Sequence, residues 1–161
     1  MKIYPSDPSN VKVLAYDLFE LLGLNALSEE EKEKYIDQFI VITVDFFLQG
    51  KISTNLSAEQ MKSLMSKYGE VTAENFDAFL TEISELVPDS AELFTEALAE
   101  TKLRVVSDHT KRLKQKWEEK LNAETDEAKK TDYQSKITQC EENLKQIIAG
   151  NFEQVNLPNK V

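Results

Sequence analysis

The chain has 161 residues; 41% of them are hydrophobic and 30% are charged, and 29 acidic against 19 basic side chains leave a net charge of −10. This composition excludes a disordered chain and is ordinary for a folded protein of one domain's length. The longest apolar run, residues 39–48, reaches only half of the roughly 20 residues that a transmembrane helix needs, which predicts no membrane partner.

Charge and cysteine content indicate which partners and which cell compartment to expect. Residues 1–88 carry 15 acidic and 7 basic side chains, whereas residues 89–161 carry 14 and 12. Because binding to a phosphate backbone depends on lysine and arginine, the front half would repel it, and we predict no direct nucleic-acid partner. The single cysteine, Cys140, cannot form an intramolecular disulfide, and we identify no secretory leader, so we expect a cytoplasmic protein.

Glycine and proline mark the ends of the predicted helices. Gly23, Gly50, Gly69 and Gly150 each follow a segment with helical apolar spacing, and all four prolines fall at or beyond segment edges. Glycine tolerates the left-handed conformation that closes a helix, and proline lacks the N–H group that a helix interior needs. The pattern predicts an all-α fold.

The first helix is predicted over residues 7–22. Asp7 can cap it, and Pro8 suits the first helical position because its missing N–H has no partner to lose there. Residues 1–6 precede this helix as an extended arm. Gly23 is expected to close it.

The second helix is predicted over residues 28–50. Ser28 and Glu31 have the spacing of a capping box, in which a hydroxyl and a carboxylate each accept a backbone N–H at the start of a helix. The β-branched run at residues 40–44 leaves a strand as the alternative there, and the upstream cap favours the helix.

Two shorter helices complete the front half of the chain. Ser57 and Gln60 repeat the capping-box spacing and open the third helix, while Thr72 is expected to cap a fourth helix that ends before Pro88. The four helices are predicted to pack as a compact acidic unit, residues 7–88.

A long helical hairpin is predicted over residues 89–150. No breaker occurs before residue 122, so the pattern predicts one helix of about 30 residues and about 45 Å. A last helix begins at residue 125 or 126, and its apolar residues are spaced four, three, four and three apart, a heptad seam: Tyr133, Ile137, Cys140, Leu144 and Ile147. The short connection favours an antiparallel pair. The tail, residues 151–161, keeps Phe152, Val155 and Leu157 apolar, and we expect it to dock.

Three residues could carry chemistry, and each has a structural interpretation that we favour. His109 lies on a helical stripe without a second histidine at metal-ligand spacing, and Cys140 lies among apolar neighbours in the middle of a helix. Asp45 falls on the polar line of its helix. We therefore predict no catalytic residue, no cofactor and no metal site, and no enzyme. A deep pocket that gathers Asp45, His109 and a tyrosine would reverse this prediction.

The long helix also carries a basic stretch with the only tryptophan of the chain, Trp117, inside it: Lys102, Arg104, Lys111, Arg112, Lys114, Lys116 and Lys120. Solvation or pairing across the hairpin is our main interpretation, and binding to RNA or to an acidic partner is the alternative. An exposed tryptophan often anchors a partner. The predicted partner-binding residues are Leu113, Trp117, Leu121, Tyr133 and Phe152.

Three segments follow one another in a recognisable arrangement: Leu27-Ser28-Glu29-Glu30-Glu31-Lys32, then Tyr35-Ile36-Asp37-Gln38-Phe39, and later Val87-Pro88-Asp89 before the helix that carries Phe94 and Glu96. On these features, residues 17–105 resemble a family of small acidic helical domains of unknown function from candidate-phyla bacteria. The resemblance implies an all-helical fold. It implies no residue role, since the family has no established activity. The hairpin after Lys102 and the apolar tail depart from the family's pattern.

These observations lead to a hypothesis about function. We expect a non-enzymatic protein-binding or adaptor module whose hairpin and apolar tail contact another protein or a second copy of the chain. The alternative is an acidic inhibitor that occupies the basic surface of a nucleic-acid-binding enzyme, which the −8 charge of residues 1–88 motivates.

Overall fold

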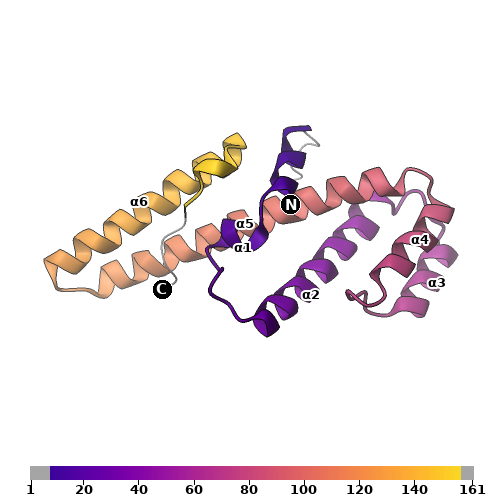
Figure 1. The fold of residues 1–161 in the computed structure, drawn as a ribbon, viewed down its shortest axis with the longest axis horizontal. Helices are drawn as coiled ribbons and strands as arrows, with labels where there is room; N and C mark the ends of the chain where they lie inside the picture. The colour runs from indigo at the N-terminus through magenta and orange to yellow at the C-terminus, as the bar shows by residue number, and fades with distance from the viewer. Residues whose placement is uncertain (1–7, 157–161) are drawn as a thin grey trace. The chain divides into compact units, whose positions relative to one another are not determined.

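Regular structure in the part of the chain that the structure describes is entirely helical. The computed structural model describes residues 8–156, is 79% helical and contains no strand within that range, which confirms the all-α fold. None of the helices in this range is long and apolar enough to cross a membrane. In chain order (Figure 1), the elements are η1 (Pro8–Ala15), α1 (Leu18–Leu22), α2 (Glu29–Phe46), η2 (Phe47–Lys51), α3 (Ala58–Tyr68), α4 (Phe76–Leu86), α5 (Ser90–Ala123), α6 (Glu127–Ala149) and η3 (Phe152–Gln154).

The described residues form two units. Residues 27–101 form one of them, which we name the acidic unit, and residues 8–26 form the other, the hairpin unit, together with residues 102–156. This division differs from the predicted one, because the first turns of α5 contribute Leu93, Phe94 and Ala97 to the core of the acidic unit. The sequence pattern had assigned that part of the chain to the hairpin, and residues 8–26 to the front unit.

The two units differ in charge. The acidic unit has 16 acidic and 5 basic side chains, a net charge of −11, whereas the described residues of the hairpin unit have 12 of each and are neutral. The excess negative charge of the chain therefore belongs to the acidic unit.

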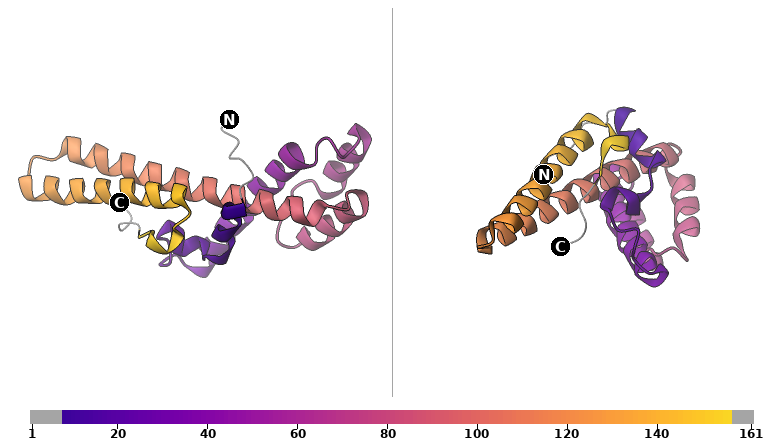
Figure 2. Two further views of the ribbon diagram at one scale, coloured as in Figure 1. Left: turned by 90° about the horizontal axis from the view of Figure 1, so that it is seen from above. Right: turned by 60° about the vertical axis from the view of Figure 1, so that its left-hand side comes forward.

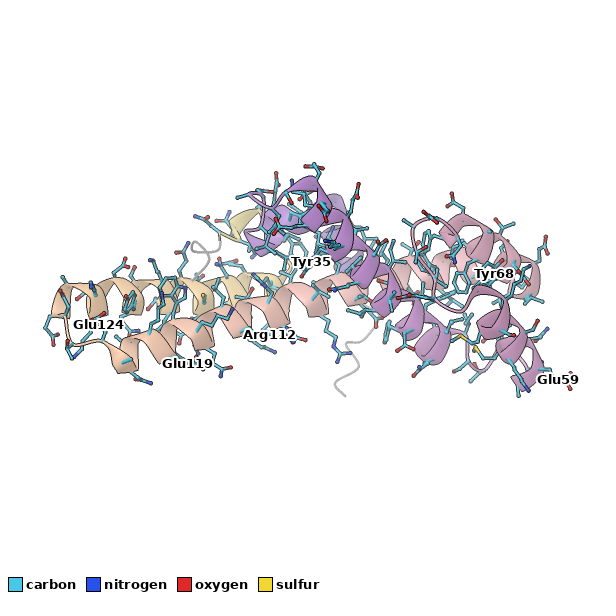
Figure 3. All side chains as sticks on the ribbon, turned by 90° about the horizontal axis from the view of Figure 1, so that it is seen from below. Tyr35, Glu59, Tyr68, Arg112, Glu119 and Glu124 are labelled. Atoms are coloured by element: carbon cyan, nitrogen blue, oxygen red, sulfur yellow. The ribbon has the colours of Figure 1, made fainter. Side chains whose placement is uncertain are left out.

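The acidic unit folds around one apolar core. Both predicted capping boxes are present, so α2 begins after Ser28 and α3 begins after Ser57. Figure 2 shows α3 and α4 beside the start of α5. These helices, α2, η2 and the segments between them contribute the buried residues of the core: Val44, Phe47, Leu48, Ile52, Leu56, Leu64, Val71, Phe79, Ile83, Val87 and Ala97. The side chains of Glu59 and Tyr68 mark the two ends of α3 in Figure 3.

Lys51 links η2 to the first part of α5 through two carboxylates. Its Nζ lies 2.8 Å from Oε1 of Glu100 and 3.2 Å from Oε2 of Glu96. Burial acts to lower the pKa of Lys51, and the hydrogen bonds to Glu100 and Glu96 outweigh burial and raise it. Lys51 is therefore a charged structural residue, held by partners on a neighbouring helix.

Gly50 does not end the second helix, contrary to the prediction. The chain continues beyond Phe46 as the π-helix η2, and the N–H group of Ile52 still donates to the carbonyl of Phe47. Gly50 lacks the positive φ of Gly23, Gly69 and Gly150. A Cβ atom at Gly50 would lie 3.2 Å from Cε2 of Phe46, so the absence of a side chain there accommodates the aromatic ring.

Residues 8–22 do not form one α-helix, so this prediction is wrong. The 3-10 helix η1 ends at Ala15, and Asp17 is extended, with φ −65° and ψ 131°. The carboxylate of Asp17 accepts the N–H of Glu20 at 3.0 Å and caps α1 as a separate helix. The predicted arm, residues 1–6, and the predicted cap, Asp7, lie outside the described residues.

The fourth helix begins later than predicted, at Phe76 instead of just after Thr72. Asn75 explains the difference, because its Oδ1 accepts the N–H of Thr72 at 2.8 Å and its Nδ2 donates to the carbonyl of Glu70 at 3.0 Å. These bonds stabilise a turn where the sequence pattern predicts helix.

The hairpin consists of the 34-residue α5 and the 23-residue α6. The predicted pair of long helices is thus confirmed. Figures 1 and 2 show the two helices side by side and running in opposite directions. Asp126 caps α6 by accepting the N–H groups of Ala128 and Lys129 at 2.9 and 3.3 Å. Lys114 on α5 pairs with Glu141 on α6 at 3.2 Å.

Replacement of Ile83 by alanine tests the core of the acidic unit. Ile83 is fully buried, whereas Leu86 on the same helix is 38% exposed, and Ile83→Ala and Leu86→Ala remove the same number of carbon atoms. We expect Ile83→Ala to lower the free energy of unfolding by about 2–5 kcal/mol because it leaves a cavity. Leu86→Ala should lower it by less than about 1 kcal/mol. Urea titrations followed by circular dichroism measure both values, and equal losses would contradict this assignment.

Candidate functional site

The apolar seam of the hairpin is closed by its own two helices. Leu113, Trp117, Ile137 and Cys140 are buried together, and Leu121 and Tyr133 pack against them half-buried. The Trp117 ring lies 5.5 Å from the Tyr133 ring, and the Nζ atoms of Lys136 and Lys120 lie 4.2 and 5.2 Å from its centre. Such contacts between cations and an aromatic face are attractive. The tryptophan is only 4% exposed, so the premise of an exposed aromatic anchor is wrong.

The described part of the tail docks within the hairpin unit. Phe152 is 3% exposed, and its ring lies 5.5 Å from the ring of Tyr16. The hydroxyl of Tyr16 donates to Oε2 of Glu153 at 3.2 Å. The docking expected of Phe152 is therefore confirmed, while Leu157 lies outside the described residues.

Asn143 holds the end of the described tail. Its Nδ2 donates to the carbonyl of Asn156 at 2.9 Å, and its Oδ1 accepts the N–H of Asn156 at 3.0 Å. Gln139 donates to the same carbonyl. One buried amide side chain thus satisfies both backbone groups of a tail residue, and its own polar atoms are satisfied in return.

The structure brings four of the five predicted partner-binding residues into one cluster. Leu113, Trp117, Leu121 and Tyr133 belong to the hairpin core, and Phe152 packs against Tyr16 instead. These contacts give all five a role inside the chain. A direct role in partner binding stays a prediction.

Four of the basic residues of α5 have partners. Lys114 pairs with Glu118 and, across the hairpin, with Glu141, while Arg104 pairs with Asp108 within α5. Lys120 lies over the rings of Trp117 and Tyr133, and Lys102 donates to the carbonyl of Tyr16. Lys111, Arg112 and Lys116 are exposed and form no hydrogen bond or ion pair with any residue that the structure describes. Figure 3 shows Arg112 and Glu119 along α5, and Glu124 in the loop after the helix.

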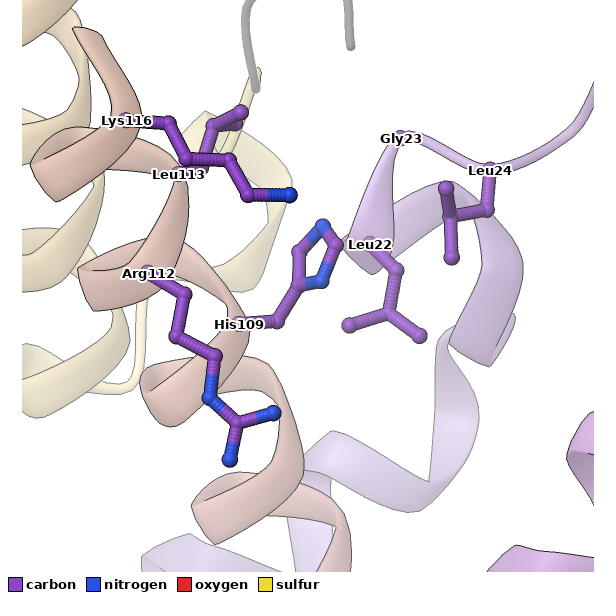
Figure 4. A pocket seen from close by; sticks show the side chains of 7 residues that line it. All are labelled: Leu22, Gly23, Leu24, His109, Arg112, Leu113 and Lys116. Atoms are coloured by element: carbon purple, nitrogen blue, oxygen red, sulfur yellow. The ribbon is translucent and has the colours of Figure 1, made fainter. Parts of the chain in front are cut away.

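A small pocket lies between α5 and the end of α1 within the hairpin unit. Its volume is about 170 Å³, and seven residues line it: Leu22, Gly23, Leu24, His109, Arg112, Leu113 and Lys116. In Figure 4 the imidazole of His109 points toward Leu22, and the side chain of Lys116 extends to the same side. The pocket thus combines cationic side chains from α5 with apolar side chains from the end of α1, the residues just after it, and α5.

Gly23 gives the α1 side of the pocket its shape. With a φ of 66°, it lets the N–H groups of Gly23 and Leu24 turn back to the carbonyls of Glu20 and Phe19, at 3.1 and 2.8 Å. This pair of bonds is a Schellman motif, which closes the helix and needs a left-handed residue. The motif leaves Leu22 and Leu24 facing the pocket.

Asp45, His109 and Cys140, the three candidate catalytic or metal-binding residues, do not come together in one site. The pocket beside His109 is lined by neither Asp45 nor a tyrosine. Asp45 is exposed, as predicted, and accepts a hydrogen bond from Gln49 at 2.6 Å. Cys140 is fully buried, as predicted, and burial raises the pKa of its thiol to about 11. No group of three potential metal-ligating side chains occurs among the residues that were described.

Sequence reasoning missed the pocket and the Asn143 contact. His109, Arg112 and Lys116 are spaced three and four residues apart, which places them on one face of a helix. That spacing could have predicted the α5 side of the pocket. The opposite wall could not be predicted, because it comes from α1, far away in the sequence.

Comparisons of the chain with protein-family models, with curated proteins and with solved structures find no match. The resemblance to small acidic helical domains therefore stays a prediction.

The burial of Cys140 predicts a thiol that is unreactive in the folded protein. The thiolate is the reactive form, and with a pKa of about 11 very little thiolate is present at about pH 8. We expect a thiol reagent to leave the native chain unmodified and to modify it fully in urea. Mass spectrometry measures the modified fraction. Rapid labelling of the native chain would show that the packing of α5 against α6 does not cover this residue.

Replacement of Asn143 by alanine tests how the tail is held. We expect Asn143→Ala to speed hydrogen exchange at the Asn156 amide and to lower the free energy of unfolding by about 0.5–1.5 kcal/mol, because the N–H of Asn156 loses its acceptor while its carbonyl keeps Gln139 as a donor. Gln134→Ala, at an exposed position of the same helix, is the matched control. Unchanged exchange at Asn156 in the first variant would contradict the role of Asn143.

Proposed function

We propose that the chain is a non-enzymatic protein-binding module in which the hairpin unit supplies the contact surface. The supporting observation is the exposed basic group on α5, formed by Lys111, Arg112 and Lys116, which the described chain leaves without an ion-pair partner. Nearby cations of the same hairpin, such as Lys114, do have acidic partners. An incoming acidic protein segment would complete the pairing.

The proposed surface differs from the one that the sequence pattern suggested. The apolar seam around Trp117 and the tail residue Phe152 are buried against other parts of the hairpin unit. They support the surface instead of forming it. Exposed cations on a packed helix are held on a fixed backbone, which lowers the entropic cost of binding.

The partner that suits this surface is another protein with exposed carboxylates. A second copy of the chain also qualifies, because its acidic unit has a net charge of −11. We propose a cytoplasmic protein that contacts neither nucleic acid nor a membrane directly, since its net charge of −10 disfavours approach to phosphate-rich surfaces.

The acidic unit supports a second candidate function, that of an inhibitor that occupies the basic surface of a nucleic-acid-binding enzyme. The observation in its favour is the concentration of charge in residues 27–101. At the start of α2, the side chains of Glu29 and Glu30 are 88% and 77% exposed even though each pairs with a lysine. Such a surface selects cationic partners.

Affinity capture from native-cell extract with charge-reversed variants tests the proposal. We expect Arg112→Glu with Lys116→Glu to lose a protein that the wild type retains, because two attractive charges become repulsive. Lys129→Glu with Lys145→Glu, at exposed positions of α6, makes the same charge change and should retain that protein. Circular dichroism verifies that both variants are folded.

Other outcomes identify which proposal fails. Equal capture by both variants would contradict a role for the basic surface of α5. Loss of capture only in Glu29→Lys with Glu30→Lys would transfer the function to the acidic unit. A strictly monomeric chain in sedimentation that captures nothing would refute both candidates.

A further inference from the structure

The pocket beside the basic surface has the size of a single small group. Its volume of about 170 Å³ is below the range of roughly 300–1,000 Å³ that is typical of sites for larger ligands. It exceeds the roughly 150 Å³ of an apolar cavity that binds benzene. One amino-acid side chain together with its terminal group matches this volume.

The α5 wall of the pocket presents two cations that repel each other. Arg112 and Lys116 are four residues apart, and like charges at this spacing destabilise a helix. Elsewhere on the hairpin, a lysine forms an ion pair with an acid at this spacing, as in Lys114 with Glu118 and Lys136 with Asp132. Asp108, four residues before Arg112, pairs with Arg104 instead. An anion bound between Arg112 and Lys116 would supply the missing opposite charge.

The α1 wall of the pocket provides apolar contact and no free backbone donor. Leu22 and Leu24 lie there with Leu113 from α5, and all three are less than one-tenth exposed. The N–H groups of Gly23 and Leu24 are already bonded within the Schellman motif. An anion must therefore be held by α5 side chains, and the group beside it must be apolar.

We propose that this pocket binds the C-terminal residue of a partner protein, with a side chain no larger than leucine. The inference rests on the proposed function and names the partner group that the basic surface receives. In a C-terminal residue, the carboxylate and the side chain leave the same carbon atom. One such residue can place its carboxylate at Arg112 and Lys116 and its side chain against Leu22 and Leu24.

Other anions fit this arrangement less well. The carboxylate of an internal aspartate or glutamate has no apolar branch beside it, and an inorganic phosphate has none at all. Either would leave the leucine side of the pocket without a matching group. The terminal carboxylate of an apolar residue satisfies both walls.

The geometry of the cations allows this contact. In Figure 4, Lys116 extends toward His109, whereas the guanidinium of Arg112 points away from Lys116. Arg112 is exposed and has no hydrogen bond to a described residue, so its rotation toward a carboxylate breaks no such contact. A guanidinium can then bind the carboxylate through two parallel hydrogen bonds.

A titration of the full chain with matched probes tests the inference. The probes are a short uncharged peptide that ends in leucine with a free carboxylate, the same peptide with an amidated end, N-acetyl-leucine, and inorganic phosphate. Methyl signals of Leu22 and Leu24 in nuclear magnetic resonance spectra report binding. We expect the free-carboxylate peptide to bind at least about tenfold more tightly than its amide, because charged hydrogen bonds are lost.

Variants locate the binding to the pocket. Arg112→Gln and Lys116→Gln should each lower the affinity for the free-carboxylate peptide by about tenfold, whereas Lys129→Gln on α6 should leave this affinity unchanged. Equal affinity of the peptide and its amide would overturn the inference. Phosphate that binds as tightly as the peptide would overturn it in favour of a general anion site. N-acetyl-leucine that binds while the peptide does not would identify a free organic acid as the ligand instead.

The failures of the two proposals can be distinguished. If partner capture depends on Arg112 and Lys116 but no probe shifts the methyl signals, the protein-binding surface stands and the terminal-residue inference is refuted. If the peptide binds but capture is the same in the charge-reversed variant and its control, the pocket assignment stands and the proposed function of the basic surface is refuted.

Discussion

Both units depend on the unbroken helix of α5. Thirty-four consecutive residues form one helix, whose early residues Phe94 and Ala97 belong to the core of the acidic unit and whose later residues Leu113 and Trp117 belong to the hairpin core. A proline in its interior would cost about 3 kcal/mol or more by removing a hydrogen bond and creating a clash. The helix therefore tolerates no breaker, which explains why prolines and glycines are found only outside it.

The hairpin unit buries the aromatic residues and the seam that the sequence pattern offers for partner binding, although Ile148 stays exposed. Trp117 and Cys140 are buried between α5 and α6, and Phe152 is buried with Tyr16. Arg112 and Lys116 line a pocket and have no acidic partners among the described residues. Binding by charge and by a small pocket agrees better with this structure than binding by a long apolar seam.

Local sequence signals predicted the helices, and long-range contacts determined the rest. The capping boxes at Ser28 and Ser57 and the seam through Ile137 and Cys140 were found because each depends on residues within a few positions of one another. The break at Asp17 was missed because helical apolar spacing continues across it. The pocket was missed for a different reason: His109 lies opposite Leu22, and no sequence period links two residues so far apart.

The position of Trp117 makes it an intrinsic fluorescence probe of the hairpin unit. It is the only tryptophan of the chain, and it lies in the hairpin unit. The aromatic residues of the acidic unit are phenylalanines and two tyrosines, Tyr35 and Tyr68. Indole emission therefore follows the hairpin unit alone, while backbone ellipticity follows every helix. Melting curves that coincide would identify one cooperative folding unit, and curves that separate would identify two.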